Sequence, residues 1–187
     1  MPAHPDFQEP VRLMSDGAGL ATDAQQALAR TVSLTLTGDE PRTVVAALLD
    51  DHLQPAIHGT HPKPATDRQR QFLAELGGPQ ADEPQLNRNI ASAWIEHLLT
   101  LRTIEALIRL QPAKNDAVIA RKVTNFEGQT TESLYFHIIS SIGADGLIYF
   151  KGGNGQCARA GRVTKALPSD NPNDYPQFRE LTEDQSL

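Results

Sequence analysis

The sequence lacks several features that define common protein classes. It has one cysteine, Cys157, in 187 residues, which excludes an internal disulfide or a zinc site built from several cysteines and favours a reducing compartment. No apolar run approaches the roughly 20 residues that span a bilayer. The N-terminal segment has neither the basic nor the apolar region of a secretion signal. We therefore expect a cytoplasmic protein with no membrane partner.

Motifs for catalysis and cofactor binding are also missing. The glycine-rich segment near residue 155 lacks the Gly-Lys-Ser/Thr ending of a P-loop and the spacing of a dinucleotide fingerprint, and no serine lies in a Gly-x-Ser-x-Gly elbow. His52, His58 and His61 are expected to be loop histidines rather than metal ligands. A small enzyme would need a structure that brings Cys157 and His137 together in a cleft. We predict a protein that is not an enzyme and has no metal or cofactor.

The charge is distributed unevenly along the chain. The formal net charge of -6 excludes a uniformly basic surface. However, residues 102–165 hold nine basic and five acidic side chains, a net of +4, between flanks with net charges of -6 and -4. Such segregation is typical of proteins with a polyanionic partner, although chance segregation on a solvated surface is an equal alternative.

Hydrophobic periodicity predicts an α+β fold. A strand is expected over residues 31–37, where Val32, Leu34 and Leu36 alternate with hydroxyl residues, followed by a helix. No internal repeat is predicted. The expected organisation is a flexible arm (1–20), a small N-terminal strand-helix unit (21–54), a proline-rich linker (55–65), a helical pair with a C-terminal antiparallel sheet of three to four strands (66–167) and an acidic tail (168–187).

Local patterns place the elements more closely. Thr22 with Gln25, and Thr66 with Gln69, match the capping box that begins a helix. A long helix is predicted from about Ile90 to the Gln-Pro pair at 111–112. Strands are predicted over 118–123, 133–142 and 147–150, with Tyr135, His137 and Ile139 on one face of the second strand and Leu134, Phe136 and Ile138 on the other.

The hairpin around residue 150 is the best candidate for a binding site. Its glycines let backbone amides approach an anion, its basic residues attract phosphates, and Tyr149 or Phe150 offers a ring for a base. The alternative is an ordinary hairpin whose glycines permit positive φ and whose basic residues keep a sheet edge soluble. The predicted contact residues are Lys122, Tyr149, Lys151, Gly152, Gly153, Asn154, Arg159, Arg162 and Lys165.

One segment resembles a known module. TDRQRQFL at residues 66–73 and ASAWIEHL at residues 91–98 follow the pattern T-x-x-Q-x-x-F-[LI] and then A-S-x-x-I-x-x-L. The pattern resembles a short two-helix module of phage, plasmid and actinobacterial proteins, often attached to proteins of DNA replication or recombination. It covers about residues 66–100 and carries no catalytic residues. The resemblance implies an association with nucleic acid without identifying a site.

These observations predict an accessory protein that binds single-stranded or irregular DNA or RNA through the basic glycine-rich hairpin. The acidic tail is expected to compete with nucleic acid for the basic surface. The alternative is a protein-interaction or homo-oligomeric assembly module that binds no nucleic acid.

Overall fold

The computed structural model describes residues 5–79, 81, 83–126, 129–152 and 155–175. Its fold is α+β, as the sequence predicts, and the chain divides into two compact units. Residues 12–104 form a helical unit, and residues 1–11 with 105–187 form a sheet unit. The long helix α5 (Arg88–Leu110) contributes its first part to the helical unit and its end to the sheet unit. Among the described residues, every helix is too short or too polar to cross a bilayer.

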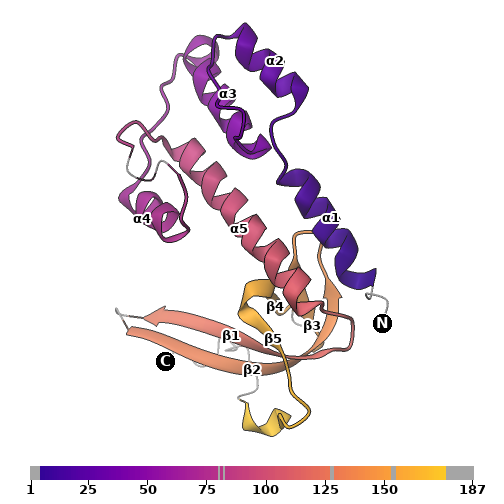
Figure 1. Cartoon of the computed structure of the whole chain (residues 1–187). Coiled ribbons are helices and arrows are strands. Elements are labelled where there is room, and N and C mark those ends of the chain that lie inside the picture. The colour runs from indigo at the N-terminus through magenta and orange to yellow at the C-terminus, as the bar shows by residue number, and fades with distance from the viewer. Residues whose placement is uncertain (1–4, 80, 82, 127–128, 153–154, 176–187) are drawn as a thin grey trace. The chain divides into compact units, whose positions relative to one another are not determined.

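The helices begin largely where the capping patterns predict. Thr22 and Thr66 each accept a hydrogen bond from the backbone three residues later, and the Gln at that position bonds back, so both capping boxes are confirmed. Helix α5 also confirms the predicted long helix. The other helices are α1 (Gln8–Gly17), α2 (Asp23–Thr31), α3 (Arg42–His58) and α4 (Asp67–Glu75) (Figure 1).

The sheet unit is built on one long antiparallel hairpin (Figure 1). The strand order is β4-β3-β2-β1-β5, so the sheet has five strands rather than the predicted three to four. The two additional strands are short and follow turns, and they give no readable alternation in the sequence. The bounds are β1 (Ala117–Phe126), β2 (Gln129–Ile142), β3 (Leu147–Phe150), β4 (Cys157–Arg159) and β5 (Val163–Lys165).

The described N-terminal half differs from the sequence predictions in three places. Residues 8–17 of the predicted arm form α1, because Val11 and Met14 supply partly buried apolar positions at helical spacing. The predicted strand at 31–37 is absent, because no neighbouring strand pairs with it. Its alternate residues Val32, Leu34 and Leu36 pack instead against a core of Ala29, Val45 and Leu49.

The predicted linker is also shorter than expected. Helix α3 continues through Pro55 to His58, and only the residues after Gly59 connect it to the next helix. Proline is tolerated there because it lies in the last turn, where it costs one hydrogen bond near an end that frays anyway. Gly59 then ends the helix in a left-handed conformation (φ 63°).

The helical unit contains the same helical hairpin twice, contrary to the expectation of no repeat. The first copy spans residues 19–58 and the second 63–104. Each begins with Ala-Thr-Asp-x-Gln, forms a short capped helix and returns through a long helix whose first residue is arginine. In each copy the capping Gln also donates to the carbonyl of that arginine, from Gln25 to Arg42 at 3.0 Å and from Gln69 to Arg88 at 3.3 Å.

Backbone hydrogen bonds repeat at equivalent positions as well. A two-bond bridge ties the start of each short helix to the start of its long helix, and a Schellman pair ends each short helix. The bridge bonds are Ala21 N to Glu40 O and Arg42 N to Gly19 O in the first copy, and Ala65 N to Leu86 O and Arg88 N to Lys63 O in the second. The Schellman bonds are Leu34 N to Ala29 O and Ser33 N to Arg30 O, and Gly78 N to Leu73 O and Gly77 N to Ala74 O.

Polar residues also occupy equivalent positions of the two long helices. Asn89 of the second copy donates to Asp51 Oδ1 of the first at 2.7 Å, and burial raises the pKa of Asp51. The counterparts of these two residues are Thr43 and His97. Each of these counterparts buries a polar atom that lacks a hydrogen-bond partner within the described part of the chain. The contact between Asn89 and Asp51 therefore joins the two hairpins, and its equivalent between Thr43 and His97 is not made.

The repeat predicts the effect of a substitution at the end of α2. Ser33 has φ 59° where the second copy has Gly77 at φ 75°. A left-handed residue with a Cβ costs roughly 1–2 kcal/mol, part of which is offset by the chain entropy that glycine loses on folding. We expect Ser33→Gly to raise the free energy of unfolding by about 0.5–1 kcal/mol in chemical denaturation.

The matched control is Ser15→Gly, which makes the same change inside helix α1. It should lower the free energy of unfolding by about 0.5 kcal/mol because glycine is a poor helix former. Opposite changes in the free energy of unfolding would show that glycine is favoured at Ser33 because of its left-handed backbone. A destabilising Ser33→Gly would contradict the equivalence of Ser33 and Gly77.

Candidate functional site

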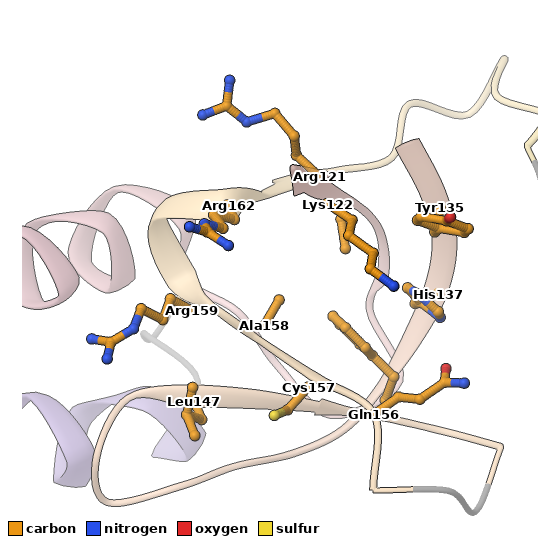
Figure 2. Close-up of a pocket in the computed structure, with 12 residues that line it drawn as sticks. Arg121, Lys122, Tyr135, His137, Leu147, Gln156, Cys157, Ala158, Arg159 and Arg162 are labelled. Carbon is orange, nitrogen blue, oxygen red and sulfur yellow. The ribbon is translucent and has the colours of Figure 1, made fainter. Parts of the chain in front are cut away.

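A cavity of about 340 Å³ opens on the sheet unit and is lined by several of its aromatic and basic side chains. We call it the sheet cavity. Its lining residues come from four strands, from Gln156 just before β4 and from the 3-10 turn Ala160–Arg162 that follows β4 (Figure 2). They are Ala120, Arg121, Lys122, Tyr135, His137, Leu147, Phe150, Gln156, Cys157, Ala158, Arg159 and Arg162. No acidic residue is among them.

Strand register places the aromatic residues. Tyr135 and His137 are two residues apart on β2, so their side chains share a face, opposite Ala120 and Val118 of β1. Phe150 of β3 pairs with Ile139 and joins the same face. The small side chains of Ala120 and Ala158 among the lining residues leave the space that the cavity occupies.

The three rings stack on one another. The His137 and Phe150 centroids lie 4.2 Å apart with an interplanar angle of 6°, and Tyr135 follows at 6.3 Å from His137 with an angle of 27°. Burial lowers the pKa of His137, so its imidazole is neutral at neutral pH. The row of rings is therefore uncharged, with His137 between Tyr135 and the buried Phe150, and the positive charge of the cavity comes from its lysine and arginines.

The basic residues of the cavity have different surroundings. Lys122 lies two residues beyond Ala120, and its side chain runs toward His137 (Figure 2). Arg159 and Arg162 stand on the side opposite the Tyr135 and His137 rings, and within the described residues neither forms an ion pair. Arg121 points away from the cavity and pairs with Glu132 at 3.5 Å, so its charge is partly compensated.

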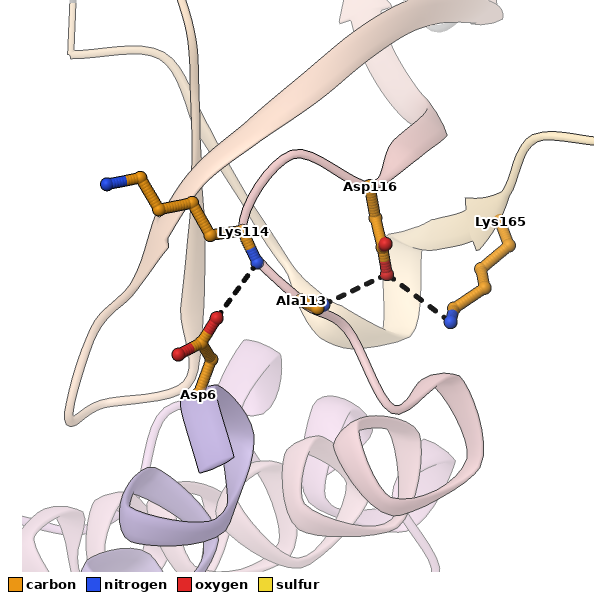
Figure 3. A network of polar contacts seen from close by, with 5 residues as sticks. All are labelled: Asp6, Ala113, Lys114, Asp116 and Lys165. Carbon is orange, nitrogen blue, oxygen red and sulfur yellow. Dashed lines mark hydrogen bonds and ion pairs between the residues drawn. The ribbon is translucent and has the colours of Figure 1, made fainter. Parts of the chain in front are cut away.

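The structure brings together only some of the residues that the sequence predicts. Lys122, Arg159 and Arg162 line the sheet cavity. Lys165 does not, because its Nζ lies 3.3 Å from Asp116 Oδ2, which also accepts from Ala113 N (Figure 3). Lys151 and Gly152 are exposed and are not among the lining residues. Gly153 and Asn154 lie outside the described residues.

Tyr149 is placed away from the cavity. Tyr149 is not among the lining residues, although Leu147, two residues earlier on β3, and Cys157, its partner on β4, both are. The Tyr149 ring packs over the β2–β3 turn, where a Cβ on Gly143 would approach Tyr149 Cε2 to 3.2 Å. Phe150, the other ring suggested by the sequence, is the one that contributes to the cavity.

Sequence reasoning missed Tyr135 and His137 as site residues. The signal was present, because their alternation on β2 places them on one face. Lys122 is a further two-residue step along the same face of β1, but a single sequence does not show which residues of two strands stand opposite each other. The pairing of Tyr135 with Ala120 supplies that information.

The geometry of the cavity gives little support to the alternative of an enzyme that uses Cys157 as a nucleophile. Cys157 and His137 both line it, and Cys157 is exposed. However, the Cys157 sulfur points away from His137 (Figure 2), whereas activation of a thiol requires the base within hydrogen-bond reach. The described residues also contain no group of three side chains suited to holding a metal ion.

No protein-family model, curated protein or solved structure matches the chain.

Proposed function

We propose that the protein is a non-catalytic accessory protein that binds single-stranded or irregular DNA or RNA through the sheet cavity. The observation that carries this proposal is a row of three stacked rings that shares one cavity with Lys122, Arg159 and Arg162 and with no acidic lining residue. Aromatic rings stack with any base, and basic side chains neutralise backbone phosphates. Together they recognise a nucleic acid without reading its sequence.

The dimensions of the cavity favour unpaired bases over a duplex. In a duplex each base is already stacked and its faces are covered, whereas a single strand can turn a base outward onto an aromatic side chain. A cavity of about 340 Å³ has no room for a double helix. Single strands, loops and frayed ends therefore fit this site better than uninterrupted duplex.

The test is a titration by fluorescence anisotropy with a labelled single-stranded oligonucleotide and its duplex. We expect the single strand to bind more tightly, with affinity that falls steeply between about 50 and 200 mM salt. Three or four neutralised phosphates give a slope of log K against log salt of about -2 to -3. Absence of binding to either ligand at low salt would refute the proposal.

The acidic tail adds a second arm to this titration. In the described part of the tail, Tyr175 lies with its ring 6.1 Å from Phe136, which alternates with the cavity residues along β2 and so faces the other side of the sheet. Removal of residues 176–187 keeps this contact and takes away three acidic side chains and one basic one. If the tail competes for the sheet cavity, the shortened chain should bind the single strand more tightly.

The alternative function, a protein-interaction or oligomeric assembly module, is favoured by apolar side chains exposed on the sheet unit. Leu134 is 43% exposed and Leu167 is 65% exposed. Size-exclusion chromatography with light scattering separates the two functions. A stable oligomer that forms without nucleic acid, together with no binding in the anisotropy titration, would favour assembly.

A further inference from the structure

The sheet cavity is small for a nucleic-acid groove. Its volume of about 340 Å³ is at the lower end of the roughly 300–1,000 Å³ typical of small-molecule pockets. A protein surface that follows a nucleic-acid strand would instead be an open groove, lined by basic and aromatic side chains on which successive bases stack. The cavity size therefore suits one nucleotide rather than a run of them.

The two sides of the cavity differ in chemistry in the way that the two ends of a nucleotide differ. The stacked rings of Tyr135 and His137 lie on one side, and Arg159 and Arg162 stand on the other (Figure 2). A base is flat, aromatic and uncharged, whereas a phosphate is a compact anion that arginine binds through paired N–H donors. One nucleotide laid across the cavity satisfies both sides at once.

The arginines are available for this role. Within the described residues, neither Arg159 nor Arg162 has an ion-pair partner, whereas Arg121 is held by Glu132 and Lys165 by Asp116. The short 3-10 turn between β4 and β5 carries Arg162 and brings it to the cavity beside Arg159. An anion bound here would not have to displace an acidic side chain.

We propose that the sheet cavity binds a single unpaired nucleotide, with its base against the ring of Tyr135 at the end of the stacked row and its phosphate on Arg159 and Arg162. This inference rests on the proposed nucleic-acid binding and narrows it to one nucleotide of the strand. A free nucleoside monophosphate then carries all the groups that the cavity recognises. It is therefore a ligand in its own right and a competitor of the oligonucleotide.

The experiment is a competition measured on the full chain. A labelled single-stranded oligonucleotide is bound first and then displaced with adenosine monophosphate, adenosine or inorganic phosphate. We expect the monophosphate to compete at least about tenfold better than adenosine or phosphate alone, because only it occupies both sides of the cavity.

Substitutions at Tyr135 and Arg162 test which side of the cavity binds the base and which binds the phosphate. Tyr135→Leu removes the ring and should reduce the advantage of the monophosphate over inorganic phosphate, while Tyr135→Phe keeps the ring and should preserve that advantage. Arg162→Gln should reduce the advantage of the monophosphate over adenosine. Tyr149→Leu is the matched control, because Tyr149 belongs to β3 but is not among the lining residues, and it should leave competition by all three ligands unchanged. A thermal melt checks that each variant folds.

The outcomes separate this inference from the function on which it rests. If the oligonucleotide binds but the monophosphate competes no better than inorganic phosphate, the single-nucleotide site is wrong and strand binding stands. If Tyr149→Leu acts as strongly as Tyr135→Leu, the base does not lie in the sheet cavity. If the oligonucleotide itself does not bind, both proposals fail.

Discussion

Substituting Arg159→Gln and Arg162→Gln together should weaken binding of a single-stranded oligonucleotide by about tenfold to a hundredfold at low salt. The two arginines are the cavity cations that lack an ion-pair partner among the described residues. A hydrogen bond to a charged group contributes about 1.5–3 kcal/mol when desolvated and less at an exposed site. A contribution near 1 kcal/mol from each exposed arginine gives a loss of about thirtyfold, in the middle of this range.

The salt dependence distinguishes a lost phosphate contact from a general loss of fold. Each phosphate contact on a single strand adds about 0.7 to the slope of log K against log salt. Because both arginines hold the same phosphate in the single-nucleotide site, the double variant should bind with a slope that is shallower by about 0.7. A variant that is merely unfolded in part would lose affinity without this change in slope.

The matched control is Lys151→Gln with Lys165→Gln. It makes the same change in net charge within the same unit, but Lys151 is not a lining residue and Lys165 is paired with Asp116. We expect less than a threefold loss of affinity. Equal losses in the two double variants would show that the whole basic segment binds nucleic acid, as the charge distribution alone suggests, and that the cavity has no special role.

The difference between these two pairs shows what the sequence predicts about the site and what it does not. The basic segment is visible from charge counting, and it contains Lys122, Arg159 and Arg162. Which of its cations remain available depends on contacts between distant residues. Lys165 is neutralised by Asp116 through the pairing of β5 with β1, and no local pattern reports that contact.

The fold was predictable where local signals are strong. Capping at Thr22 and Thr66, the long apolar period of α5 and the alternation along β1 to β3 all depend on neighbouring residues. The strand predicted at residues 31–37 was wrong because alternation indicates which side chains face a core. It does not indicate whether a second strand lies beside the segment to pair with it. Leu34 and Leu36 do face a core, but helices α2 and α3 provide it.

The duplicated hairpin was hidden by divergence at its core positions. The Ala-Thr-Asp-x-Gln start is shared, but the buried residue that follows in the short helix is Ala29 in the first copy and Leu73 in the second. Similar backbones with different core volumes share few identical residues. Hydrogen bonds at equivalent positions reveal the repeat because they depend on the backbone and on two capping side chains.

The same core position is the basis of the second large effect. Leu73 is fully buried in α4, within a cluster that includes Val44 and Ile90. We expect Leu73→Ala to lower the free energy of unfolding by about 2–5 kcal/mol, because it loses buried apolar surface and leaves a cavity. Chemical denaturation measures the change. The equivalent residue of the first copy, Ala29, is already an alanine, and Leu34 packs against the cluster that contains it. The second copy has Gly78 at the position of Leu34. It therefore has no side chain at that position to fill the space that Leu73 would leave.

The neighbouring Phe72→Ala is the control, because it removes a larger side chain from a position that is 39% exposed. Its effect should be no more than about 1 kcal/mol, since the ring already contacts water and leaves no closed cavity. Rescue is expected from Gly78→Ala in the Leu73→Ala background. In the unmodified chain a Cβ at Gly78 would meet Leu73 Cδ1 at 2.2 Å and the end of the Leu98 side chain at 2.9 Å, so Gly78→Ala alone should destabilise the protein, mainly through Leu73. Additive losses in the double variant would contradict this account, because the two residues would then not share the same space.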